Sequence, residues 1–122
     1  KRMLSSMSPT IVMKDGYPFL VTGSPGGSRI ITTTLQVLLN TLVFDMSVSE
    51  AVTAPRFHHQ WKPDILRLET GFSPDTINKL KDKGFKVKTM RTMGAAESIL
   101  INDDLFYGMA DTRKPQSKAK GI

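Results

Sequence analysis

Residues 23–44 read Gly-Ser-Pro-Gly-Gly-Ser-Arg-Ile-Ile-Thr-Thr-Thr-Leu-Gln-Val-Leu-Leu-Asn-Thr-Leu-Val-Phe. The first five positions are a glycine- and proline-rich break, of the kind that ends a strand and begins a turn. The run that follows has the length of a globular helix, and its apolar residues cover most of the helix circumference. The stretch therefore predicts a glycine turn that leads into a long buried helix over about residues 28–44.

The sequence before the glycine turn predicts a β-hairpin. Thr10–Met13 and Tyr17–Thr22 are rich in β-branched and apolar residues, and Lys14-Asp15-Gly16 separates them as a turn. Extended segments are also expected later in the chain, at residues 56–60, 65–70, 85–90, 98–101 and 105–109. This order lacks regular β-α-β alternation, so the predicted fold class is α+β with mixed or antiparallel strands.

Two shorter helices are predicted after the long one. Ser47 and Glu50 have the spacing of a capping box, which begins a short helix that must stop before Pro55. Ser73-Pro74-Asp75 combines a capping serine, a proline in the first turn and an acidic residue, and Gly84 ends that helix. These local signals fix where both helices begin.

Composition excludes several classes of protein. The 122 residues contain no cysteine, which removes disulfides and thiolate ligands, and no apolar run is long enough to span a membrane. The net charge of +6 comes mainly from residues 79–91 and from a basic tail at about 114–122. Few aromatic residues interleave with these cations, so a solvated surface is favoured over nucleic-acid binding. A non-catalytic basic binding module stays open as an alternative function.

The glycine turn carries the most chemical information. Its spacing fits neither the Gly-x-Gly-x-x-Gly dinucleotide motif nor a phosphate-binding loop, which needs lysine after the last glycine. Adjacent N–H groups of Gly26 and Gly27 at a helix start could instead stabilise an oxyanion. A tight turn without any ligand, and a nucleophilic Ser28 assisted by His58 or His59, are the alternatives.

Two further groups of side chains are candidates for binding a ligand. Neighbouring His58 and His59 on a strand point to opposite faces, so no metal site is predicted there. Ser5 and Ser6 lie in a serine-rich segment just before the first strand, and their hydroxyl groups could hydrogen-bond a carboxylate.

Three segments resemble the γ-glutamyltranspeptidase (glutathione hydrolase) family. They are Leu-Ser-Ser-Met-Ser-Pro-Thr-Ile-Val at residues 4–12, Gly-Ser-Pro-Gly-Gly-Ser-Arg-Ile at residues 23–30 and Ala-Pro-Arg-Phe-His-His-Gln-Trp at residues 54–61. They occur in the order and at the spacing of that family. Thr112 departs from the family pattern, which has proline between the residues equivalent to Asp111 and Arg113.

The resemblance implies an N-terminal-nucleophile hydrolase with α-β-β-α layers, made as a precursor that cleaves itself into two subunits. Residues 1–122 would be the C-terminal part of the small subunit. Its partners would be the large subunit and the missing N-terminal part of the small subunit. The family's bacterial members imply a periplasmic or secreted location, and the resemblance implies no cofactor.

The resemblance also assigns roles within the reaction. The enzyme would cleave γ-glutamyl amides such as glutathione through a glutamyl-enzyme, and pass the glutamyl group to water, amino acids or peptides. Ser5 and Ser6 would contact the glutamyl carboxylate, and Gly26 and Gly27 would form the oxyanion hole. The threonine nucleophile is not in this sequence and is expected upstream of Lys1, so these residues alone would be inactive. A related acylase for poly-γ-glutamate or β-lactam side chains is an alternative.

Overall fold

A computed structural model describes residues 5–121 and divides the chain into two compact units. Of the described residues, the first unit consists of residues 5–54 with residues 94–121, and the second of residues 55–93. The elements of the first unit are β1 (Thr10–Lys14), β2 (Tyr17–Gly23), the 3₁₀ turn η1 (Gly27–Arg29), α1 (Ile30–Leu42), α2 (Val48–Thr53), β6 (Glu97–Asn102) and β7 (Leu105–Met109). Those of the second are β3 (Phe57–His58), β4 (Leu66–Glu69), α3 (Pro74–Asp82) and β5 (Val87–Met90).

The first unit is built on a four-stranded antiparallel sheet in the order β1-β2-β6-β7. Asp15 and Gly16 form the turn between β1 and β2, and both have positive φ, 51° and 84°. That pair of conformations matches the twist of the strands it joins, which is why an Asp-Gly turn makes a tight hairpin here. The predicted hairpin and the antiparallel pairing are confirmed.

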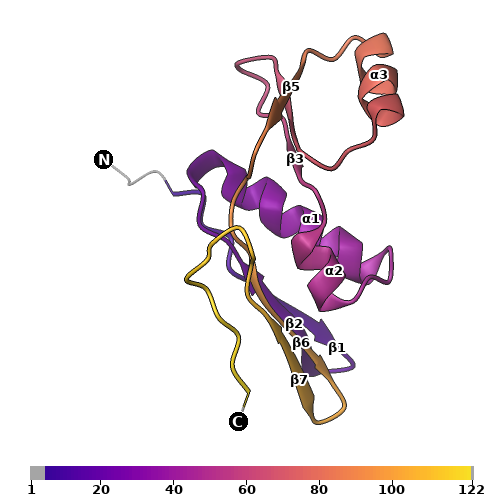
Figure 1. Cartoon of the computed structure of the whole chain (residues 1–122). Coiled ribbons are helices and arrows are strands. Elements are labelled where there is room, and N and C mark those ends of the chain that lie inside the picture. The colour runs from indigo at the N-terminus through magenta and orange to yellow at the C-terminus, as the bar shows by residue number, and fades with distance from the viewer. Residues whose placement is uncertain (1–4, 122) are drawn as a thin grey trace. The chain divides into compact units, whose positions relative to one another are not determined.

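Both helices of the first unit lie on one face of this sheet (Figure 1). The core between them is formed by small apolar side chains, with Leu100 and Met109 of the sheet packed against it. Its buried members are Val37, Val48, Ala51, Val52 and Ala96. The predicted α+β class is therefore confirmed, with helices stacked on an antiparallel sheet.

The predicted long buried helix over residues 28–44 is wrong in extent and in burial. Residues 27–29 form a 3₁₀ turn, and α1 runs only over Ile30–Leu42. The face toward the core carries Ile30, Val37 and three threonines, while four other large apolar residues point away from it. These outward residues are Ile31, Leu35, Leu39 and Leu42, and they are between 39% and 54% exposed. The sheet covers only one side of the helix, and an apolar count around the helix cannot say which side.

Side-chain caps fix the ends of α2. The Ser47 hydroxyl accepts a hydrogen bond from the Glu50 N–H, and the Glu50 carboxylate accepts one from the Ser47 N–H, so the predicted capping box is present. At the other end, the Arg113 guanidinium donates to the carbonyl groups of Val52 and Ala54, both at 2.9 Å. The helix is thus tied to a residue 59 positions further along the chain.

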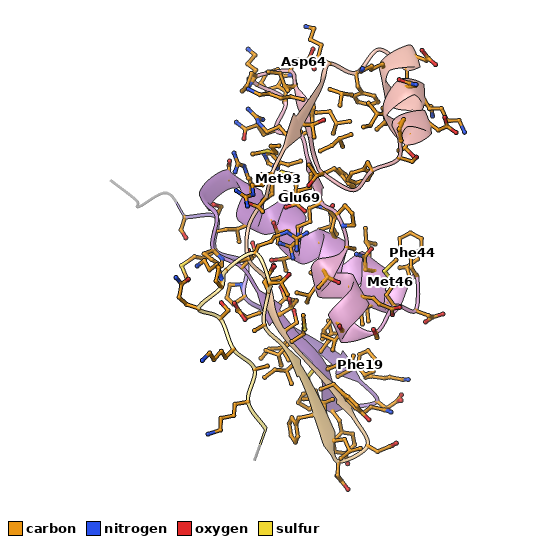
Figure 2. All side chains as sticks on the ribbon, in the orientation of Figure 1. Phe19, Phe44, Met46, Asp64, Glu69 and Met93 are labelled. Atoms are coloured by element: carbon orange, nitrogen blue, oxygen red, sulfur yellow. The ribbon has the colours of Figure 1, made fainter. Side chains whose placement is uncertain are left out.

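The second unit has a three-stranded mixed sheet, in which β4 pairs antiparallel with β3 and parallel with β5. Ser73 caps α3 with Pro74 in its first turn, and Gly84 follows the helix with φ 90°, as predicted. Glu69 at the end of β4 is buried, and its carboxylate accepts hydrogen bonds from the N–H groups of Arg56 and Met93 (Figure 2). One carboxylate therefore ties together the two ends of this unit, at Arg56 and Met93.

The basic tail leaves β7 and returns along the sheet of the first unit. The Ser117 hydroxyl donates to the Glu97 carboxylate at 2.7 Å, and Ala119 lies against Gly108. Within residues 5–121, no helix combines the length and the apolar character needed to cross a membrane.

Candidate active site

The glycine turn between β2 and α1 has a backbone that other residues adopt poorly. Gly26 has φ 142° and Gly27 has φ 59°. The first value is essentially restricted to glycine, and the second lies in the left-handed region that asparagine tolerates best among other residues. Both residues are exposed. The backbone φ angles of this turn therefore require glycine at position 26 and favour it at position 27.

The N–H groups of Gly26 and Gly27 make no hydrogen bond to any part of the chain between residues 5 and 121. The turn also lies directly before a helix, where N–H groups have no partner within the helix. Two adjacent donors are therefore available on an exposed turn at the positive end of a helix dipole. This arrangement suits a negatively charged oxygen.

The carbonyl groups of the same turn are occupied. The Pro25 carbonyl accepts a hydrogen bond from the Ser24 hydroxyl at 2.7 Å, and the Gly26 carbonyl accepts one from the Arg29 N–H at 3.2 Å. The Gly27 carbonyl accepts one from the Ser6 hydroxyl at 2.9 Å. The turn is therefore held through its carbonyl oxygens while its glycine N–H groups remain available.

Ser5 and Ser6, predicted as carboxylate contacts, have different surroundings. Ser6 is partly buried and bonded to the glycine turn, whereas Ser5 is exposed. The Ser5 oxygen accepts a hydrogen bond from the Met7 N–H at 3.3 Å. The structure thus brings the two predicted pairs, Ser5–Ser6 and Gly26–Gly27, to the same end of α1.

Sequence reasoning missed three residues behind the turn: Ser24, Gly94 and Ala95. The Ser24 oxygen accepts a hydrogen bond from the Ala95 N–H at 3.1 Å. A Cβ atom on Gly94 would lie 2.6 Å from Oγ1 of Thr33 and 3.0 Å from Oγ of Ser24. These contacts show that Gly94 leaves room for the Ser24 side chain behind the turn. The positive φ of Gly94, 65°, and its close neighbours are visible only in the structure, and neither leaves a motif in the sequence.

The side chains of His58 and His59 are hydrogen-bonded to neighbouring residues. His58 is buried and bonds the Gln60 side chain at 3.0 Å, while His59 bonds Asp64 at 3.2 Å. The hydrogen bond from His59 and the adjacent Lys86 ammonium lower the pKa of Asp64 (Figure 2). Over residues 5–121, no three histidine or acidic side chains gather as a metal site would require.

A hollow of about 770 Å³ is lined by residues of the two hairpin turns, among them Tyr17, Phe19 and Asp104. Tyr17 begins β2 and the glycine turn follows its other end. This hollow is therefore separate from the available N–H groups and does not serve them as a substrate pocket.

Comparison with known proteins gives consistent results. Residues 1–121 match the family model described as Gamma-glutamyltranspeptidase. The chain is 56% identical over 122 residues to the glutathione hydrolase proenzyme of Escherichia coli, and 38% identical over 117 residues to that of Bacillus subtilis. These alignments cover 99% and 93% of the chain but only 21% and 20% of the relatives, so the chain spans about a fifth of their length.

Solved structures extend the likeness to the fold. A structure of Helicobacter pylori γ-glutamyltranspeptidase matches with a TM-score of 0.91 and 51% identity, covering 93% of this chain and 64% of that one. The Bacillus anthracis transpeptidase CapD matches with a TM-score of 0.84 and 26% identity, covering 100% of this chain and 74% of that one.

Proposed function

The chain belongs to the γ-glutamyltranspeptidase family, and on that premise we propose that it is the C-terminal part of the small subunit of a glutathione hydrolase. The complete enzyme cleaves the γ-glutamyl amide of glutathione or a related compound. It passes the glutamyl group to water, to an amino acid or to a peptide. Residues 1–122 provide the oxyanion hole and the carboxylate contact for this reaction.

The first step is an attack by an N-terminal threonine that lies outside these residues. Its hydroxyl oxygen bonds to the γ-carbonyl carbon, its proton passes to the threonine's own α-amine, and the carbonyl oxygen becomes an oxyanion. The Gly26 and Gly27 N–H groups donate to this oxygen. The amide C–N bond then breaks, the leaving amine takes the proton, and a glutamyl ester remains. Water or an amino group attacks that ester in the same way.

One observation carries this proposal: at the start of α1, beside Ser6, two adjacent glycine N–H groups make no hydrogen bond within residues 5–121. Removal of one such donor from an oxyanion hole typically reduces kcat by about 10²–10³-fold. Ser5 and Ser6 lie next to this turn; Ser5 can donate to the glutamyl α-carboxylate directly, whereas the Ser6 hydroxyl can do so only by leaving the Gly27 carbonyl.

The exposed apolar surfaces support the proposed partners and layers. Leu35 and Leu39 on the outer face of α1, and Ile11 and Ile99 on the sheet face away from the helices, are all exposed large apolar residues. Surfaces of this kind mark interfaces. The large subunit and the N-terminal part of the small subunit cover them and complete the α-β-β-α layers. The proenzyme is processed into these subunits in the periplasm or after secretion.

Expression of the complete proenzyme tests the proposal. It should cleave itself into two subunits that remain associated, release amine from a chromogenic γ-glutamyl anilide, and hydrolyse glutathione. Gly27→Val should abolish most of the kcat. A processed protein that is inactive on both substrates would contradict the proposed function.

Two alternatives make different predictions. A poly-γ-glutamate or β-lactam acylase would prefer those substrates to glutathione; the identity of 56% to the glutathione hydrolase proenzyme of Escherichia coli favours glutathione. A basic binding module would bind DNA or RNA with an affinity that falls steeply with salt. Competition assays with the three substrates, and a salt titration with an oligonucleotide, separate these outcomes.

A further inference from the structure

Each of the two donor N–H groups belongs to a peptide unit whose carbonyl oxygen is itself hydrogen-bonded. The Gly27 N–H shares its peptide with the Gly26 carbonyl, which accepts from the Arg29 N–H at 3.2 Å. The Gly26 N–H shares its peptide with the Pro25 carbonyl, which accepts from the Ser24 hydroxyl at 2.7 Å. The first peptide is thus held by the backbone of the 3₁₀ turn, and the second depends on one side chain.

Ser24 is itself held from the other side. Its oxygen accepts a hydrogen bond from the Ala95 N–H at 3.1 Å, so the hydroxyl proton is directed to the Pro25 carbonyl. The result is a short chain of hydrogen bonds from the Ala95 N–H through the Ser24 hydroxyl to the Pro25–Gly26 peptide. In such a chain each bond polarises the next.

Gly94 permits this arrangement. A Cβ atom there would lie 2.6 Å from Thr33 Oγ1 and 3.0 Å from Ser24 Oγ. The Gly94 Cα also lies directly behind Gly26, at 3.6 Å from the position of a Cβ atom on that residue. Any side chain at Gly94 would therefore push the Ala95 N–H away from Ser24 or displace the turn.

We infer that Ser24 is a positioning residue for the oxyanion hole, and that the Gly94–Ala95 backbone supports it. This inference rests on the proposed function. Ser24 touches no substrate; its hydroxyl fixes the plane of the Pro25–Gly26 peptide and makes the Gly26 N–H a stronger donor. Donors fixed in advance need no reorganisation when the oxyanion forms, so the effect of Ser24 belongs to the transition state.

The test uses Ser24→Ala in the complete, processed enzyme. We expect kcat to fall by about tenfold, which is less than the loss of a whole donor, while the inhibition constant of free glutamate stays within about twofold. A boronic acid analogue of glutamate, with boron in place of the γ-carbonyl carbon, forms a tetrahedral adduct with the nucleophile. Its affinity should fall by the same factor as kcat, because it mimics the transition state.

Matched variants separate positioning from folding. Ser24→Thr keeps the hydroxyl group and should retain most of the kcat. Ser117→Ala removes a serine hydroxyl that bonds Glu97 on the exposed tail, and should leave kcat and processing unchanged. Gly94→Ala should lower kcat and boronate affinity together. If Ser24→Ala accumulates as unprocessed precursor, Ser24→Cys, with a weak donor in the same place, gives the same comparison.

The outcomes distinguish this inference from the proposed function. An active wild-type enzyme whose Ser24→Ala and Ser24→Cys variants keep full kcat, or lose kcat without losing boronate affinity, overturns the positioning role alone. A processed wild-type protein that neither cleaves γ-glutamyl amides nor binds the boronate overturns both.

Discussion

The Ser6 hydroxyl donates a hydrogen bond of 2.9 Å to the Gly27 carbonyl, across 21 positions of sequence. A serine expected to recognise the substrate carboxylate is therefore bonded to the turn expected to stabilise the oxyanion. A hydroxyl group has only one proton, so Ser6 cannot donate to the carboxylate while this bond is made. The Ser5 oxygen accepts from the Met7 N–H, and among residues 5–121 its hydroxyl proton has no acceptor, so it can donate to the substrate.

Substitution of Ser5 and of Ser6 should therefore change KM and kcat differently. Ser5→Ala should raise KM by about tenfold or more, since a hydrogen bond to a charged group contributes about 1.5–3 kcal/mol, and should leave kcat nearly unchanged. Ser6→Ala should lower kcat as well, because it releases the Gly27 carbonyl. Steady-state kinetics of the two processed variants measure this split. Equal effects of both substitutions on KM alone would contradict a role for Ser6 in holding the turn.

The two glycines should differ in what they tolerate. Gly27 has φ 59° and no atom within 4 Å of an added Cβ, so its restriction is conformational. Asparagine adopts this region more readily than valine, and Gly27→Asn should retain more kcat than Gly27→Val. Gly26 at φ 142° has no such substitute. Gly26→Asn should therefore lose about as much kcat as Gly26→Val, and a tolerant Gly26→Asn would argue against this backbone in the enzyme.

Much of the local structure could be predicted because its signals are local. The Ser47–Glu50 box, the Ser73 cap and the Asp15-Gly16 turn all use partners within three residues, and all are present. The bond from Ala95 to Ser24 spans 71 positions, and nothing in the sequence marks it.

The orientation of helix α1 is a second feature that the sequence does not predict. Its inward face carries Thr33, Thr34 and Thr41, which are buried, while Leu35 faces outward. Hydrophobicity alone would turn the helix the other way, because leucine burial stabilises more than threonine burial. The interface proposed for the complete enzyme explains the outward leucines, and the small threonines leave room for α1 to approach the sheet and α2. The glycine turn was identified by its residues, but the roles of Ser5, Ser6, Gly26 and Gly27 in catalysis remain predictions.

Asp111 and Arg113 should be essential for stability rather than for chemistry. The Asp111 carboxylate is buried and accepts hydrogen bonds from the Ala96 N–H at 2.7 Å and the Arg113 N–H at 2.9 Å. It also pairs with the Arg113 guanidinium at 3.2 Å. Loss of one partner of a buried pair costs about 3–5 kcal/mol, so Asp111→Ala should lower the free energy of unfolding by about that amount.

Arg113→Lys is the matched variant for this pair. It keeps the charge but cannot reach both the Val52 and Ala54 carbonyls in the same geometry, and should destabilise less than Arg113→Ala. Denaturant unfolding of the complete protein measures both. A stable Asp111→Ala protein, or a selective loss of kcat without loss of stability, would contradict a structural role.

The Ser47–Glu50 capping box should weaken in acid. The hydrogen bonds from the Ser47 hydroxyl and the Ser47 N–H lower the pKa of Glu50 below its ordinary value of 4.5. A lowered pKa means that the folded state favours the carboxylate, so this stabilisation is complete above pH 4.5 and is lost as the pH falls through the folded value. The difference in Tm between the wild type and Glu50→Gln should therefore shrink from pH 6 to pH 3. In a Ser47→Ala background this pH dependence should become smaller, because only the hydrogen bond from the backbone N–H of residue 47 to the Glu50 carboxylate remains.

The outer face of α1 should be an interface within the complete enzyme. Ile31, Leu35, Leu39 and Leu42 recur on one side of the helix, and all are substantially exposed in residues 5–121. Burial of a leucine stabilises by about 1.5–3 kcal/mol, and a buried unpaired charge adds a further penalty. Leu35→Asp should therefore lower the yield of associated large and small subunits after processing.

Ser49→Asp on α2 provides the control for that substitution, because Ser49 is exposed and an acidic residue in the first turn of a helix is favourable. Co-purification of the tagged large subunit with the small subunit, followed by size-exclusion chromatography, measures association. The Ser49→Asp enzyme should assemble as the wild type does, whereas Leu35→Asp should yield separated or unprocessed subunits. Normal assembly of Leu35→Asp with unchanged Tm would show that this face stays in water, and that α1 carries its leucines outward for another reason.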